Sequence, residues 1–100
     1  MGVICTGKVR MDRDSAEKLS ILMMQLNAKM DESVAFVLDH DTDGTFENYK
    51  LIAGKIMASF YLDIENKLWK KYPELLPEAM EGTYKIDPKI YEPRFYDPKD

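Results

Sequence analysis

The fold is decided by residues 19–69, LSILMMQLNAKMDESVAFVLDHDTDGTFENYKLIAGKIMASFYLDIENKLW, in which two apolar repeats flank one polar turn. In each repeat the apolar side chains recur every three or four residues, which is the spacing of one face of an α-helix. In the first repeat they are Leu19, Leu22, Met23, Leu26, Met30, Val34 and Val37. In the second they are Phe46, Tyr49, Ala53, Ile56, Met57, Phe60, Ile64 and Leu68. The pattern predicts a mainly α protein built on two long helices.

The ends of the two repeats carry residues that begin and end helices. Asp14 is a suitable N-cap for the first helix, and Pro73 stops the second. A break in the first helix near residues 31–33 stays open, because Asp31 could start a new helix there. Only about six residues join the two helices, so we expect an antiparallel helical hairpin over about residues 14–72.

All five prolines lie in residues 73–100, which makes this segment unsuited to a long helix. The segment also holds aromatic side chains, among them Tyr91, Phe95 and Tyr96, and is too apolar for a solvated linker. We therefore expect an extended, proline-punctuated C-terminal tail that docks on its own subunit or on a neighbouring one. Hairpin and tail together are expected to form a single domain, residues 1–100.

Composition excludes several classes of protein. The chain has 100 residues, a net charge of −4 at pH 7 and one cysteine, so no intrachain disulfide can form. A general nucleic-acid binder needs a concentrated basic surface, which this balance does not provide. No apolar run approaches the ~20 residues that span a bilayer. We expect a cytoplasmic protein that binds neither nucleic acid nor membrane.

Each predicted helix also carries a second, narrower apolar strip away from its main stripe. A hairpin buries one face of each helix, and leaving a large apolar side chain in water forgoes about 1.5–3 kcal/mol. The strips therefore predict a homodimer in which two hairpins form a four-helix bundle, or alternatively coverage by the protein's own tail. The first helix contributes Ile21, Met24, Ala28 and Ala35 to these strips. The predicted interface residues are Leu51, Ala58, Leu62, Trp69, Ile21, Met24, Tyr91, Phe95 and Tyr96.

Residues typical of catalysis are scarce. His40 is the only histidine and lies in the acidic turn, and no nucleophile elbow, phosphate-binding loop or zinc-protease motif is present. We expect a non-enzymatic interaction protein without a cofactor, which self-associates and acts as an adaptor or regulator of an unidentified protein partner.

The turn between the helices resembles an EF-hand calcium loop over residues 39–50. Carboxylates stand at its first, third and fifth positions and Gly44 at the sixth, whereas the twelfth, a bidentate glutamate in EF-hands, is Lys50. The resemblance implies an alternative function, divalent-cation binding. The implied ligands for calcium are Asp39, Asp41, Asp43 and Glu47. The same residues also fit an exposed turn in which Asp43 caps the second helix.

The first eleven residues allow two interpretations. The stretch MGVICT, residues 1–6, matches the pattern for N-terminal myristoylation, with Cys5 as a second acylation site. The apolar residues Val3, Ile4 and Val9 equally fit a minor N-terminal strand, which would need a pairing partner to be stable.

Overall fold

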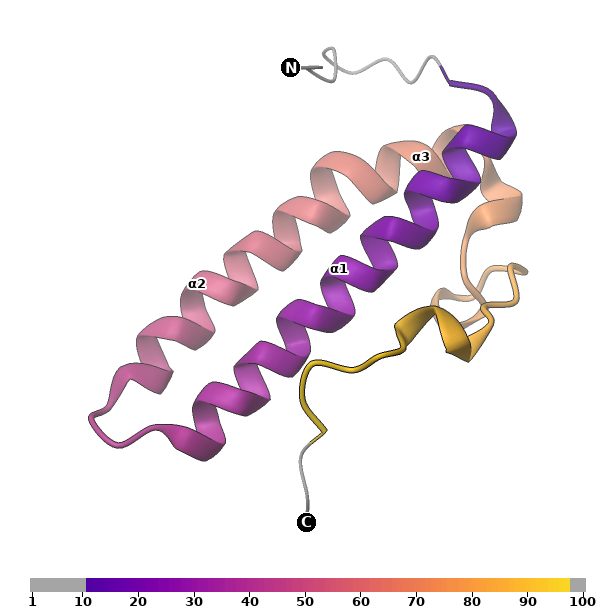
Figure 1. Ribbon diagram of the computed structural model, residues 1–100. Helices are drawn as coiled ribbons and strands as arrows, with labels where there is room; N and C mark the ends of the chain where they lie inside the picture. Colours follow the sequence, from indigo (N-terminus) through magenta and orange to yellow (C-terminus); the bar gives the residue numbers. More distant parts are fainter. Residues whose placement is uncertain (1–10, 98–100) are drawn as a thin grey trace.

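The computed structural model describes residues 11–97, which are mainly helical (Figure 1). A long helix, α1 (Arg13–His40), is followed by α2 (Thr45–Ser59), the π-helical turn η1 (Phe60–Glu65) and α3 (Asn66–Lys71). No β-strand occurs among these residues, so the prediction of a mainly α chain is confirmed. The tail contains three short 3₁₀ turns, η2 (Pro73–Leu75), η3 (Glu78–Met80) and η4 (Pro88–Tyr91).

The helix α1 is continuous. The Asp12 carboxylate accepts a hydrogen bond from the Ser15 N–H at 2.8 Å, so the N-cap is Asp12 and not the expected Asp14. The helix runs without a break through residues 31–33, because the apolar stripe stays in phase across them. The first of the two predicted rods is therefore one helix that ends at His40.

The second rod departs from a regular α-helix at η1. The Asn66 N–H donates to the Tyr61 carbonyl, which is the i→i+5 bond of a π-helix. Such a turn adds one residue to the helix. Because each residue corresponds to about 100° around the helix axis, the side chains that follow are rotated by about that angle relative to a regular α-helix. Trp69 therefore leaves the strip of Leu51 and Leu62, on which regular spacing placed it, and is buried.

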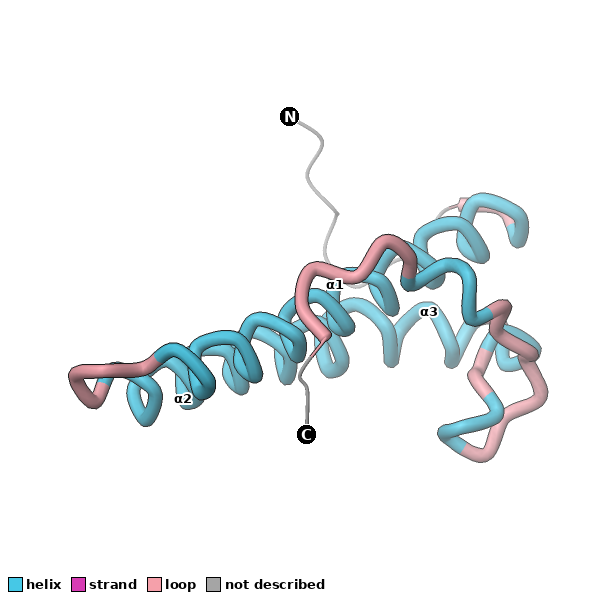
Figure 2. Tube along the Cα trace, turned by 60° about the horizontal axis from the view of Figure 1, so that its bottom comes forward, coloured by secondary structure: helices cyan, strands magenta, loops and turns pink. Residues whose placement is uncertain are grey.

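The two rods lie side by side and run in opposite directions (Figures 1 and 2). Near the start of α1, Ser20 Oγ accepts the indole N–H of Trp69 at 3.0 Å, and farther along Tyr49 donates to Ser33 Oγ at 2.7 Å. Positions later in α1 therefore contact positions earlier in the second rod, as in an antiparallel pair. At the connecting turn Gly44 has φ of 83°, a conformation that glycine adopts without a Cβ penalty.

The best-buried apolar residues gather where α3 meets the first turns of α1. The cluster consists of Ala16, Leu68, Trp69 and Leu75. Partly buried residues packed against it are Met11, Leu19, Ile64, Tyr72, Leu76 and Tyr84. The largest buried cluster of the described chain therefore sits at one end of the rods, while Met23, Met24 and Ala53 are buried farther along them.

After α3 the chain turns tightly over residues 76–84. Pro77 and Tyr84 form an isolated bridge, and the Tyr84 N–H donates to the Leu76 carbonyl at 3.0 Å. Gly82 approaches Leu76 so closely that a Cβ on Gly82 would lie 2.0 Å from the Leu76 carbonyl oxygen. This contact requires glycine for reasons of space.

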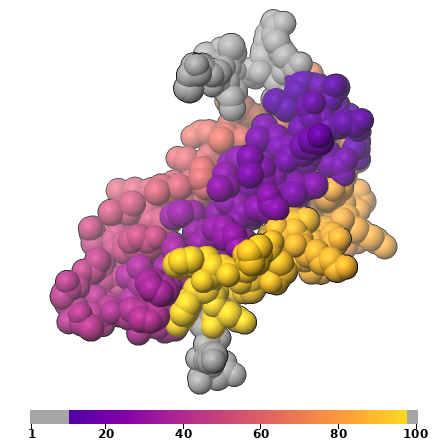
Figure 3. All heavy atoms as spheres, in the orientation of Figure 1, coloured from indigo at the N-terminus to yellow at the C-terminus, as the bar shows by residue number. Residues whose placement is uncertain are grey.

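The tail then returns to α1. Its last described part, residues 88–97, is here named the strap, and it lies against the α1 surface (Figure 3). The peptide bond between Glu92 and Pro93 is cis.

Two of the sequence-based hypotheses concern the first residues of the chain. The N-terminal strand and the acylation pattern with Cys5 lie outside the described residues. Within residues 11–97, no helix combines the length and the apolar character needed to cross a bilayer.

Replacing Gly82 by alanine should lower the free energy of unfolding by about 1–3 kcal/mol, because the Leu76 backbone must move to admit the methyl group. Urea unfolding followed by circular dichroism measures the change. The control is Gly54→Ala in α2, where nothing lies within 4 Å of the added Cβ. That variant should gain about 0.5–1 kcal/mol from helix propensity. Equal stability of Gly82→Ala and the native protein would contradict the close approach.

Candidate functional site

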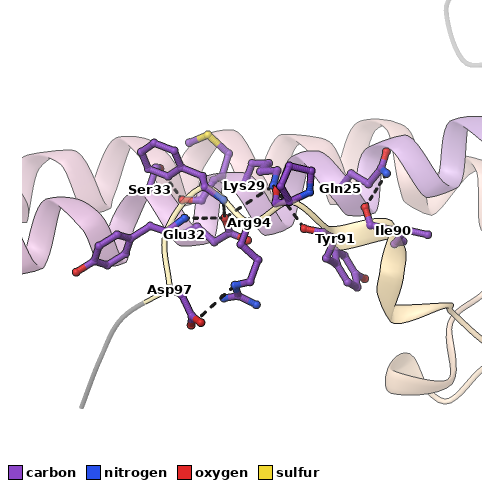
Figure 4. Close-up of polar contacts among 12 residues, drawn as sticks. Gln25, Lys29, Glu32, Ser33, Ile90, Tyr91, Arg94 and Asp97 are labelled. Atoms are coloured by element: carbon purple, nitrogen blue, oxygen red, sulfur yellow. Dashed lines mark hydrogen bonds and ion pairs between the residues drawn. The ribbon is translucent and has the colours of Figure 1, made fainter.

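Side chains of α1 hold the strap by its backbone (Figure 4). The Gln25 amide donates to the Ile90 carbonyl at 2.8 Å. One turn later, the Lys29 ammonium donates to the carbonyls of Tyr91, at 3.5 Å, and Pro93. Because the acceptors are main-chain oxygens, these contacts hold the strap independently of its side chains.

The third α1 side chain in this row, Glu32, is buried and accepts two N–H groups of the strap. They belong to Phe95, at 2.5 Å, and Tyr96, at 3.2 Å. Burial acts to raise the pKa of the Glu32 carboxyl, but the two N–H groups and the positive charges of Lys29 and Arg94 outweigh it. The pKa of Glu32 is therefore lowered, and the carboxylate is the form that holds the strap.

The end of the strap is held by an aromatic cluster around Phe36. The Phe36 ring stacks on His40 with ring centroids 4.2 Å apart, and its centroid lies 5.3 Å from those of Phe95 and Tyr96. The Tyr96 hydroxyl donates to the Asp39 carboxylate at 2.6 Å, and this bond raises the pKa of Tyr96. Phe95 and Tyr96, two of the predicted interface residues, thus contact α1 of their own chain.

The acidic turn uses its carboxylates to cap α2. Asp41 Oδ1 accepts the N–H groups of Asp43, at 3.2 Å, and Thr45, at 2.9 Å. Burial acts to raise the pKa of Asp41, but these N–H groups outweigh it and the pKa is lowered. Asp43 also accepts from Thr45, Asp39 bonds to the strap, and Glu47 is exposed. In the described part of the chain, no three His, Cys, Asp or Glu side chains lie together as a metal site, so calcium binding stays a prediction.

Two of the predicted interface residues are covered within the subunit. Trp69 is 6% exposed and donates its N–H to Ser20 in the core. Met24 of α1 is buried beside the tail, and Ile21 is half-buried. Trp69 and Met24 therefore offer no free surface to a second copy. Trp69 packs on α1, whereas the sequence-based alternative named only the tail as cover.

Three predicted interface residues of the second rod remain exposed. Leu51 is 63% and Leu62 58% exposed, and Ala58 is exposed between them. By helical spacing they lie on the side of α2 opposite the buried Ala53, and Lys55 interrupts them. We name these three residues the outer strip.

Leu38 is 55% exposed, and four further aliphatic side chains are exposed as well, three of which regular spacing assigned to the main stripes. Leu22 and Leu26 on α1, and Ile52 and Ile56 on α2, are between 38% and 48% exposed. Each pair is spaced i, i+4 and forms a row along its helix. We name these four residues the open face.

The two rows of the open face lie on the same side of the helix pair. Ser33 continues the α1 row seven residues after Leu26, and Tyr49 precedes Ile52 and Ile56 by three and seven residues. The hydrogen bond from Tyr49 to Ser33, 2.7 Å long, therefore joins the rows. Sequence reasoning missed this face because two helices touch along a narrow line, and the flanks of both main stripes stay uncovered.

A cleft of about 480 Å³ opens on the other side of the helix pair, between α1, the second rod and the tail. Inside it the carboxyl of Glu65, from η1, is 3% exposed and accepts the side-chain N–H of Asn27 at 2.9 Å. Burial raises the pKa of Glu65, and the bond from Asn27 offsets only part of that effect. No periodicity identified Glu65, because the π-turn directs it inward.

No protein-family model, curated protein or solved structure matches this chain. The functional conclusion therefore depends on two surfaces of the described residues, the open face and the cleft.

Replacing Glu32 by alanine should release the strap, because the N–H groups of Phe95 and Tyr96 lose a charged acceptor worth roughly 1.5–3 kcal/mol. Amide hydrogen exchange of these two residues measures the release. The neighbouring exposed Asp31→Ala is the matched control and should leave their exchange unchanged. Acid should also release the strap, because it protonates Glu32. The contribution of Glu32 to the stability of the fold is complete above its ordinary pKa of 4.5 and is lost as pH falls through its lowered folded value. Unchanged protection in Glu32→Ala would contradict this anchoring.

Glu65 should show the opposite pH dependence. Because its folded pKa is raised, its contribution to stability is complete below 4.5 and is lost as pH rises through the folded value. Glu65→Gln keeps an acceptor for Asn27 but carries no charge, so it should be more stable than the native protein at neutral pH and gain less near pH 4. Thermal unfolding at the two pH values measures the difference. A stability loss at neutral pH would show that the carboxylate is well paired.

Proposed function

We propose that this protein is a non-enzymatic helical interaction protein whose two rods form a hairpin that self-associates into a homodimer through the open face. The observation that carries the proposal is the exposure of the open face: Leu22, Leu26, Ile52 and Ile56 stay exposed along one flank of the helix pair, and the cleft opens on the other flank. Two such hairpins, packed open face to open face, would form a four-helix bundle.

The open face suits a second copy of the same chain. In a two-fold dimer the same patch is used on both subunits, so a patch made of two matching aliphatic rows is self-complementary. The four side chains are already about half-buried, so each still has about half of the 1.5–3 kcal/mol available from full burial. Eight of them in a dimer give roughly 6–12 kcal/mol, against an association cost of about 4–15 kcal/mol. We therefore expect a dimer that dissociates on dilution.

The outer strip is a weaker candidate for the main interface. It offers only two large side chains, Leu51 and Leu62, and the charge of Lys55 lies on the same side of the helix. We assign the outer strip to a contact outside the dimer core, such as the unidentified protein partner expected from the sequence.

Replacing Ile52 by glutamate should convert the dimer to a monomer, because two buried charges would face the aliphatic rows of the other subunit. Analytical ultracentrifugation over a concentration series measures the mass. At least a tenfold rise in the dimer dissociation constant is expected, or about 1.4 kcal/mol.

Leu62→Glu is the matched control, since it places the same charge on an exposed residue of the same rod. It should leave the mass unchanged, and circular dichroism should give equal helix content for both variants. A native protein that stays monomeric at high concentration would refute self-association. Dissociation by Leu62→Glu but not by Ile52→Glu would instead assign the interface to the outer strip.

A further inference from the structure

The cleft on the strapped side of the helix pair has the size and lining of a small-molecule site. Its volume of about 480 Å³ falls within the range of about 300–1,000 Å³ that ligand pockets occupy. Most of the side chains that line it are apolar or aromatic. They include Met24, Met57, Trp69, Met80, Ile86 and Tyr91.

The cleft contains one buried acceptor without a donor and a second that has a single donor. The Asn27 side chain donates an N–H to the Glu65 carboxyl, while Asn27 Oδ1 is buried and has no hydrogen-bond partner in the described structure. Among the described residues, Asn27 alone donates to the Glu65 carboxyl, although an ionised carboxylate can accept several hydrogen bonds. Buried acceptors are usually satisfied in native proteins, so this pair is suited to an incoming group that brings N–H donors.

The charges around the cleft favour a cationic donor. Three carboxylates line the cleft, from Asp31, Glu32 and Glu65, against a single guanidinium, from Arg94. Glu32 is satisfied by the strap and lies near Arg94, so these two groups offset each other. The negative charge that remains uncompensated belongs to Asp31 at the rim and Glu65 inside.

The walls are compatible with the same ligand. An aromatic face attracts an ammonium group, and Trp69 is the strongest side chain for this interaction. The thioethers of Met24 and Met57 adapt to apolar groups of varied shape. The turn η1, which carries Glu65, is a π-helical turn, and such turns are frequent at functional sites.

We propose that this cleft binds a small organic amine, with the ammonium group donating to Glu65 and Asn27 and the apolar body lying against Met57 and Trp69. The site does not depend on self-association, because the open face lies on the other side of the helix pair.

Phenethylamine is the probe, and phenethyl alcohol is its neutral counterpart of the same shape. Trp69 is the only tryptophan, so its fluorescence reports binding directly, and side-chain amide NMR signals of Asn27 report contact inside the cleft. At mildly alkaline pH the amine should bind at least about tenfold tighter than the alcohol, the value of one charged hydrogen bond.

Glu65→Gln should remove the preference for the amine, while Glu47→Gln, which neutralises an exposed carboxylate of α2 outside the cleft, should keep it. Circular dichroism and the unliganded Trp69 emission establish that both variants are folded. The proposal is overturned if the amine fails to bind at millimolar concentration, if amine and alcohol bind the native protein equally, or if the preference survives in Glu65→Gln.

Discussion

The π-helical turn η1 determines where the core of this protein lies. Because the turn inserts one residue, Trp69 joins Leu68 in the buried cluster against α1, and the Trp69 N–H reaches Ser20 at 3.0 Å. The same turn directs Glu65 inward, where it meets Asn27. The closed end of the helix pair and the polar interior of the cleft therefore have one structural origin.

The strap has a different requirement, because its backbone has no strand partner and its polar groups must bond elsewhere. Three side chains in one row of α1 provide those bonds: Gln25 and Lys29 donate to carbonyls, and Glu32 accepts N–H groups. The two buried carboxyls of residues 11–97 thus have opposite electrostatic environments. Burial acts to raise the pKa of both carboxyls. At Glu32 two N–H donors and nearby positive charges outweigh burial, so its pKa is lowered. At Glu65 there is one amide donor, and its pKa stays raised.

These contacts divide the helix pair into two sides with separate roles. One side is closed by the strap and contains the cleft, and the other exposes the open face. Self-association and ligand binding, as proposed, would use different side chains and would not compete for surface. The acidic turn belongs to neither side, since Asp41 and Asp43 bond to the first N–H groups of α2 and stabilise its start.

The sequence by itself determined the local features: two long helical segments, the turn between them, the proline-rich tail and the position of Leu51 and Leu62 away from the main stripe of the second rod. These follow from spacing and from the backbone preferences of single residues, which act over a few positions. Only the tertiary structure decided the burial of Trp69, the route of the strap and the meeting of Glu65 with Asn27. The spacing of apolar residues does not reveal a π-turn. A hydrogen bond from a side chain to a distant main-chain group cannot be predicted from sequence either, because every residue type except proline presents the same main-chain groups. Such features arise when segments far apart in the chain pack together.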